Sequence, residues 1–246
     1  TGYDWSASQF SPDGRIFQVE YAAKAVENSG TVIALKCKGG VVVASENILT
    51  SKLYEPNSFS RMFKIERHIG LVASGFLSDA REIAQIARDE ASDMRKWTGE
   101  AVALKMLSDR VSMYMHAYTL YGMVRPFGCS VLLVSCGADG SNPEIYTVEP
   151  SGTCYGYEGC AVGKAQQSAK TEIEKIKLSE IDITSLVKEA AKIIYKVHDE
   201  VKDRLFELEL GWVCKESDFK FERVPENVFK DAVEYAEAAI RDDDDD

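Results

Sequence analysis

The chain is 246 residues long and combines 45% hydrophobic with 28% charged residues, a composition typical of a folded globular protein. Its 40 acidic residues outnumber its 29 lysines and arginines and give a formal net charge of −11, of which five charges lie in the terminal aspartates 242–246, so the rest carries −6. This excess of negative charge disfavours binding to the phosphates of nucleic acids or to anionic membranes, and we expect neither as a partner.

The first half of the chain predicts one helix, two hairpins and two long helices. After a turn at Ser11–Gly14, apolar residues such as Phe17 and Tyr21 follow helical spacing. The β-branched runs on either side of Lys38–Gly39 and of Arg67–His68 indicate hairpins. We expect a helix at 16–28, strands at 31–37, 40–45, 62–66 and 69–76, and helices at 77–97 and 100–121.

The second half repeats this order and ends in a helix that Pro225 opens. We expect strands at 129–136, 144–148 and 154–162, helices at 164–178 and 184–205, strands at 207–214 and 219–223, and a last helix at 226–240. Helices grouped after hairpins indicate antiparallel sheets covered by helices. We therefore predict a single α+β domain over residues 1–241, with four layers in the order α/β/β/α, followed by an acidic tail at 242–246.

The cysteines and histidines favour neither disulfides nor a metal site. The six cysteines lie in apolar segments without a CxxC pair, so we expect reduced thiols in the core. His68, His116 and His198 have no partners at metal-ligand spacing, so no metal is expected. The chain has no run of about 18 apolar residues and its first residues lack a signal-peptide pattern, which predicts an intracellular protein.

A strand-to-helix turn at Gly159–Lys164 resembles a phosphate-binding loop but departs from its pattern. Three residues separate its glycines where the Walker A motif has four, and Ala165 stands where that motif needs serine or threonine to hold magnesium. We expect no nucleotide and no other cofactor.

Thr1 is a candidate nucleophile, because an N-terminal threonine can attack through its hydroxyl while its own amine acts as the base. That mechanism needs the threonine in a strand beside a lysine and a carboxylate, whereas Gly2–Asp4 shows no strand pattern. A free-standing N-terminal threonine hydrolase is the alternative function. A third hypothesis is an acidic adaptor that binds partners through Asp242–Asp246.

The most specific segment is Ser11–Ala22, with the sequence SPDGRIFQVEYA, preceded by Tyr3–Asp4. It resembles the N-terminal signature of 20S proteasome alpha subunits. The resemblance continues through Ser74–Gly75, Asp79–Arg81, Tyr118–Tyr121, Arg125–Gly128, Pro150–Gly152 and Gly163–Lys164. It implies an α/β/β/α sandwich of the N-terminal-nucleophile hydrolase type.

The same resemblance implies that the active site of this fold is missing. In the catalytic beta subunits, the first core strand begins with a processed threonine that has an aspartate and a lysine nearby. Here Gly30–Thr31 follows a helix, Glu46 stands about where the aspartate would be, and 54–60 offers no lysine. We therefore expect no catalytic residue and no peptidase activity.

Alpha subunits of the family form seven-membered rings that cap the beta rings, and their N-terminal segments close the axial pore. The resemblance implies a non-catalytic scaffold and gate for ubiquitin-dependent and ubiquitin-independent protein degradation in cytoplasm and nucleus. The implied partners are other alpha subunits, beta subunits and the C-terminal tails of regulatory ATPases or other activators. The gate segment is 1–15, and the residues that match the family's gate cluster are Tyr3, Asp4, Pro12 and Tyr21.

The resemblance also implies a pocket for the C-terminal carboxylate of activator tails. The matching positions are Arg61 and Gly75, with Gly14 and Ile16 lining the same groove. Arg61 stands where the family uses a lysine, and a guanidinium can hold a carboxylate through two parallel hydrogen bonds. Trp5 stands where many alpha subunits have an arginine after the Tyr-Asp pair.

Overall fold

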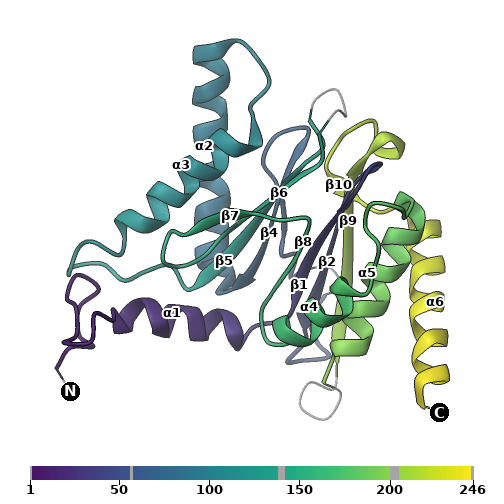
Figure 1. The fold of residues 1–246 in the computed structure, drawn as a ribbon, viewed down its shortest axis with the longest axis horizontal. Helices are drawn as coiled ribbons and strands as arrows, with labels where there is room; N and C mark the ends of the chain where they lie inside the picture. Colours follow the sequence, from purple (N-terminus) through teal and green to yellow (C-terminus); the bar gives the residue numbers. More distant parts are fainter. Residues whose placement is uncertain (1, 56–57, 138–141, 200–204, 245–246) are drawn as a thin grey trace.

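The computed structural model describes residues 2–55, 58–137, 142–199 and 205–244. Two antiparallel sheets lie face to face, and a pair of long helices covers the outer face of each (Figure 1). This arrangement confirms the predicted α/β/β/α layers.

Each sheet has five strands in the described part of the chain. The first has the order β10-β9-β2-β1-β8, with β1 at Val32–Cys37, β2 at Gly40–Ile48, β8 at Gly159–Val162, β9 at Phe206–Cys214 and β10 at Glu222–Arg223. The second has the order β3-β4-β5-β6-β7, with β3 at Met62–Lys64, β4 at Ile69–Gly75, β5 at Cys129–Ser135, β6 at Glu144–Val148 and β7 at Cys154–Gly156.

The helices form two outer layers, and one further helix, α1, lies outside these layers. The helices are α1 at Phe17–Glu27, α2 at Leu77–Thr98, α3 at Leu104–Ala117, α4 at Gln166–Glu174, α5 at Ile183–Val197 and α6 at Glu226–Asp244, with a short 3-10 turn at Lys215–Ser217. α2 and α3 cover the second sheet, whereas α4, α5 and α6 lie on the first. α1 packs against β4 and β5.

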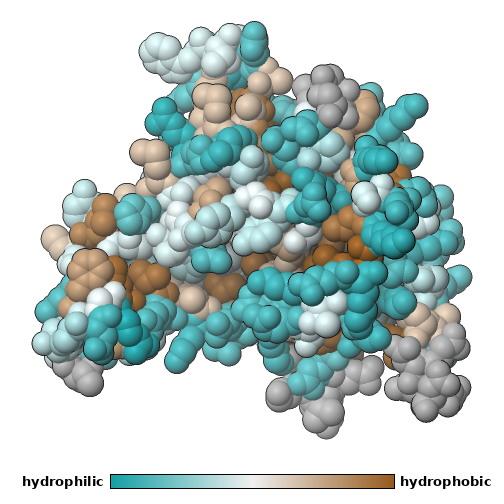
Figure 2. All heavy atoms as spheres, viewed as in Figure 1, coloured by the Kyte–Doolittle hydropathy of each residue, from teal (hydrophilic) through white to brown (hydrophobic). Residues whose placement is uncertain are grey.

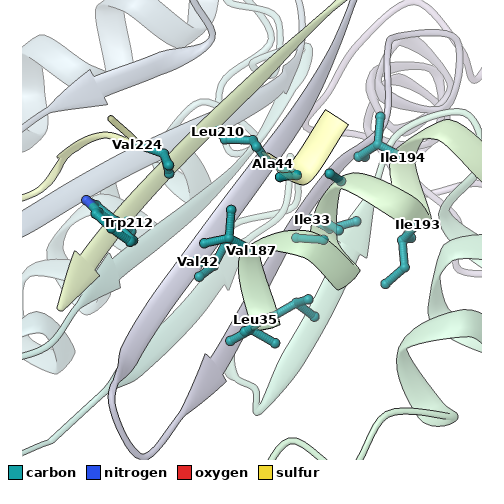
Figure 3. Packing of buried hydrophobic residues seen from close by; sticks show 14 of the residues in the cluster. Ile33, Leu35, Val42, Ala44, Val187, Ile193, Ile194, Leu210, Trp212 and Val224 are labelled. Carbon is teal, nitrogen blue, oxygen red and sulfur yellow. The ribbon is translucent and has the colours of Figure 1, made fainter. Parts of the chain in front are cut away.

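Three hydrophobic clusters fill the spaces between the four layers. Along β1 the side chains alternate: Ile33 and Leu35 face α5, while Val32 and Ala34 face the second sheet. Figure 3 shows the first group packed against Val187 of α5. Because both faces of these strands are covered, their sequences are continuous apolar runs. This pattern made the strands predictable from the sequence.

The predicted strand at 154–162 is two strands that belong to different sheets. β7 pairs with β6, and β8 pairs with β1. The chain crosses between the sheets at Tyr157 and Glu158, where the Tyr157 N–H donates to the Ile145 carbonyl and the Glu158 carbonyl accepts from Lys36. Hydrophobic pattern does not reveal this change of sheet, because the backbone stays extended on both sides of it.

The helix ends also differ from the predicted ones. The helix expected at 184–205 ends at Val197, and residues 200–204 lie outside the described part. The last helix was expected to stop at 240 but extends to Asp244, into the aspartate run. In water the repulsion between like charges costs little per pair, so helical backbone hydrogen bonding persists there. Asp245 and Asp246 lie outside the described residues.

Candidate functional site: a sealed threonine and an exposed N-terminal segment

Thr31 precedes β1 and is completely buried. Its peptide N–H donates to Oε2 of Glu46 at 2.8 Å, and its hydroxyl Oγ1 accepts from the Ala165 N–H at 3.2 Å. A peptide nitrogen has no basic lone pair, so it cannot take the proton of the hydroxyl as a free N-terminal amine does. This threonine is a structural joint between β1, β2 and the start of α4.

Glu46 is the centre of this joint and is 3% exposed. Its second oxygen, Oε1, accepts a hydrogen bond from Nδ1 of His198 at 2.6 Å, and the imidazole packs on the ring of Phe206 with centroids 4.2 Å apart. The carboxylate thus has a partner for each oxygen. Sequence reasoning placed Glu46 correctly beside the threonine but missed His198, which is 152 positions away in the chain.

Two of the motifs that carry the resemblance close the space around Thr31. The Ser74 hydroxyl donates to the Gly30 carbonyl at 2.9 Å. Gly163 has a φ of 104°, and a Cβ there would lie 2.5 Å from the same carbonyl oxygen. A side chain at 163 would therefore clash with the backbone.

Arg61 and Gly75, predicted for the activator-tail pocket, lie together. Nη1 of Arg61 donates to the Gly75 carbonyl at 3.0 Å, and burial of the guanidinium lowers the pKa of Arg61. The Arg61 N–H in turn donates to Oε2 of Glu209 at 3.0 Å. Half-buried Arg61 is thus held from both its backbone and its side chain.

Gly14 and Ile16 lie at the other end of α1 from this pair. They precede α1, whereas Ser29, whose hydroxyl donates to the Gly75 carbonyl at 3.4 Å, follows it. A helix of 11 residues is about 16 Å long. Within one chain the structure therefore brings together Arg61 and Gly75 but not all four predicted residues.

The four predicted gate residues are near the surface. Tyr3 is 38% exposed and Tyr21 45% exposed, and Pro12 is exposed in the confirmed turn at Ser11–Gly14. Asp4 lies against α1, since its carbonyl accepts from the Gln18 side chain. Among the described residues no hydrogen bond or ring contact joins the four to one another, and Oδ1 of Asp4 is buried without a partner.

Large apolar side chains are exposed around this N-terminal segment. Trp5 is 87% exposed, Phe10 65% and Met123, in the loop after α3, 99%. The segment rests on that loop, because a Cβ at Gly122 would lie 2.9 Å from the Ser6 hydroxyl. Figure 2 shows hydrophobic side chains gathered at the end of the molecule where α1 begins. Exposed apolar residues in this density are typical of a protein-binding surface.

An ion pair joins two further motifs of the resemblance. Nη1 and Nη2 of Arg125 donate to the carboxylate of Asp79, at 2.6 and 2.9 Å, and the Gly128 N–H donates to Oδ2 at 2.8 Å. The hydrogen bonds from Arg125 lower the pKa of Asp79. This pair fixes the loop at 125–128 to the start of α2.

We expect Asp79→Asn to lower the free energy of unfolding by about 1–2 kcal/mol at pH 7, because Arg125 is largely exposed and solvent weakens the pair. A depressed pKa in the folded state stabilises the fold above the ordinary pKa of aspartate, and this contribution is lost as the pH falls through the depressed value. Urea unfolding at pH 7 and near pH 3 should therefore show a smaller difference between variant and wild type at the lower pH. An equal difference at both pH values would contradict the role of the charge.

The cysteines, possible metal ligands and helix lengths point to no further kind of site. The six cysteines are free, and burial raises the pKa of Cys129 to about 12 and of Cys160 and Cys214 to about 11. Within the described ranges, no group of three His, Cys, Asp or Glu side chains could hold a metal ion. In the same part of the chain no helix has the length and apolar character needed to cross a membrane.

The fold and the sealed threonine together define a class: a sandwich of the N-terminal-nucleophile hydrolase type in which the nucleophile position lies inside the chain. A family model described as proteasome subunit matches residues 26–213, and a second, which describes the N-terminal signature of A-type proteasome subunits, matches residues 3–25. The chain belongs to the proteasome subunit family. With that signature it is an alpha-type subunit, a structural and non-catalytic part of the alpha ring that assembles with other proteasome subunits.

Curated relatives match the chain over nearly its whole length. Proteasome subunit alpha type-3 of Spinacia oleracea is 50% identical over 98% of this chain and 96% of the relative. The protein of the same name from Acanthamoeba castellanii is 49% identical over 100% and 96%. A probable proteasome subunit alpha type-7 of Saccharomyces cerevisiae is 43% identical over 100% and 86%.

Proposed function

We propose that this chain is a scaffold and gate without peptidase activity of its own, at the seventh alpha position, which the type 3 subunit occupies. The observation that carries the proposal is the burial of Thr31, whose nitrogen is a peptide bonded to Glu46. The names of the relatives, several of which are proteasome subunit alpha type-3, support the position in the ring. Thr1, the nucleophile of the alternative hydrolase hypothesis, lies outside the described residues.

The gate is residues 1–15, closed or opened through Tyr3, Asp4, Pro12 and Tyr21. Exposed tyrosines and a buried carboxylate oxygen without a partner support a cluster that is completed by a neighbouring subunit. A tyrosine hydroxyl is a suitable donor to such a carboxylate. Proline fixes the backbone in the reversal at Ser11–Gly14, which precedes α1.

The activator-tail pocket joins two subunits, with Arg61 and Gly75 from one and Gly14 and Ile16 from the next. This division is supported by the length of α1, which separates the two pairs within one chain. Partners are thus six other alpha subunits, the beta ring and the tails of regulatory ATPases or other activators. We place the assembly in the cytoplasm and nucleus, with no nucleic acid or membrane among its partners.

Removing residues 1–11 from this chain in the assembled core particle tests the proposal. We expect hydrolysis of a small fluorogenic peptide without activators to rise several-fold, because the segment no longer obstructs entry, while the fully activated rate stays unchanged. A particle carrying Thr1→Ala or Thr31→Ala is the control and should keep its maximal activity. Loss of turnover on Thr1→Ala would support the hydrolase alternative, and an unchanged basal rate after the deletion would contradict the gate.

A further inference from the structure

The N-terminal segment makes a tight turn at Ser6–Ser8 that is closed by its own side chains. The Ser8 N–H donates to Oγ of Ser6 at 3.1 Å, and the two hydroxyl oxygens lie 2.9 Å apart. Ala7, at the tip of the turn, is 1% exposed, whereas Trp5 and Phe10 on either side are largely exposed. The tip of the turn therefore faces the protein, while the flanking aromatic side chains face solvent.

The residue that receives this turn is Gly122, in the loop after α3, which reaches the N-terminal segment in Figure 1. A Cβ at Gly122 would lie 2.9 Å from Oγ of Ser6 and 3.3 Å from Oγ of Ser8. Both distances are shorter than an ordinary contact between carbon and oxygen, so the turn can lie this close only where the loop has no side chain. The φ of Gly122 is not in the left-handed region. Glycine is therefore needed here for space and not for backbone conformation.

The loop that carries Gly122 is anchored at both ends. Thr119 is 4% exposed, and its N–H and its hydroxyl both donate to the His116 carbonyl, at 2.8 and 2.7 Å. At the other end of the loop, the Asp79 carboxylate holds Arg125 through two hydrogen bonds. The loop is thus fixed to the end of α3 and to the start of α2, so the position of Gly122 is set by elements of the core.

The turn lies between two further attachments of the N-terminal segment. On one side, the Asp4 carbonyl accepts from the Gln18 side chain of α1. On the other side, the Ser11 N–H donates to the Arg15 carbonyl at 2.9 Å. Residues 5–10 span the distance between these attachments and rest on the loop after α3 through the turn. Moving the turn off Gly122 would therefore change the path of residues 5–10 and pull on the attachment at Asp4.

We propose that Gly122 is a positioning residue for the gate: it seats the Ser6–Ser8 turn and so favours the arrangement in which the segment obstructs entry. This inference rests on the proposed function of residues 1–15 as a gate. A side chain at position 122 would raise the free energy of the seated arrangement alone, so the population would shift toward arrangements in which the turn has left the loop. The four residues of the predicted gate cluster stay unchanged in such a variant.

Release of the turn is measured directly on the assembled core particle. Brief treatment with chymotrypsin, followed by mass spectrometry of the intact subunit, gives the rate of cleavage after Phe10. Because a protease cuts such a segment only once it has left the surface, we expect this rate to rise about twofold in Gly122→Ala and several-fold in the bulkier Gly122→Val. Gly39→Ala is the matched control and should keep the wild-type rate, since a Cβ there would be in ordinary contact, 3.6 Å from Cβ of Ile183. Wild-type rates in both Gly122 variants would overturn the inference.

Control of entry is measured on a separate sample as hydrolysis of a small fluorogenic peptide without activators. We expect this basal rate to be several-fold higher in Gly122→Val than in the wild type, with an unchanged fully activated rate. In a particle whose chain lacks residues 1–11, the same substitution should add nothing, because no turn is left to be seated. A further rise in that particle would overturn the inference, since the valine would then act on entry without the segment.

The positioning role and the gate itself fail in different ways. If the deletion of residues 1–11 raises hydrolysis but Gly122→Val releases the turn without raising it, the gate stands and the positioning role of Gly122 is overturned. If the deletion itself leaves hydrolysis unchanged, the gate is contradicted and its positioning residue with it. The rate of cleavage after Phe10 then still decides whether Gly122 seats the turn.

Discussion

Glu46→Ala should lower the free energy of unfolding by about 3–5 kcal/mol, because it removes the acceptor of two buried hydrogen bonds and leaves a cavity. The carboxylate is 3% exposed and accepts from both the Thr31 N–H and His198. Its loss leaves a buried N–H and a buried imidazole without their acceptor, and the truncation adds a cavity. Since a domain is stable by only about 5–15 kcal/mol, we expect little of the variant to enter assembled particles.

Urea unfolding of the purified chain and the yield of particles that contain it would measure this effect. Glu46→Gln keeps the volume and an amide oxygen that can accept from Thr31, so it should cost less than the alanine variant. Glu27→Ala, at the exposed end of α1, is the matched control and should change stability by less than about 0.5 kcal/mol. Equal losses in Glu46→Ala and Glu27→Ala would show that the joint around Thr31 adds no stability.

The elements of the fold were accessible from the sequence because their patterns are local. β6 coincides with the predicted 144–148, and the hairpins at Lys38–Gly39 and Arg67–His68 were found through β-branched runs on either side of polar turns. The division of 154–162 between two sheets was not accessible. That division depends on which strands the segment pairs with. The spacing of hydrophobic residues does not show which strands pair with each other.

The site around Thr31 could be predicted from the sequence only in part, because it too depends on residues that are distant along the chain. Resemblance to the alpha signature pointed to Thr31 and Glu46, but the groups that seal the threonine come from far along the chain. Ala165 is 134 positions from Thr31, and His198 is 152 positions from Glu46. A lone histidine before a loop carries no sequence signal for a buried carboxylate partner. The same applies to Glu209, one of two glutamates in an alternating strand.

Glu209→Ala should also lower the free energy of unfolding by about 3–5 kcal/mol. Glu209 of β9 is 4% exposed, and its carboxylate accepts from four groups, two in strands of the first sheet and two in the segment that leads into β3. These donors are the Arg61 N–H, Nδ2 of Asn47, Oγ of Ser60 and Nη2 of Arg223. A buried carboxylate is stable only when it is fully hydrogen-bonded in this way. Removing the Glu209 carboxylate therefore leaves each of these donors without its acceptor.

The variant should also affect activator docking, because Glu209 positions the backbone of Arg61 from which the guanidinium reaches Gly75. We expect Glu209→Gln, which keeps one oxygen acceptor, to retain assembly but to require a higher concentration of an activator tail peptide for half-maximal stimulation of the particle. Glu149→Ala, at an exposed glutamate that follows β6, is the matched control and should change neither stability nor stimulation. If Glu209→Gln raised the basal peptidase rate without changing the peptide concentration needed, Glu209 would act on the gate and Arg61 would not belong to the docking pocket. A shift in that concentration alone would tie the buried carboxylate to docking, since the change leaves every surface residue in place.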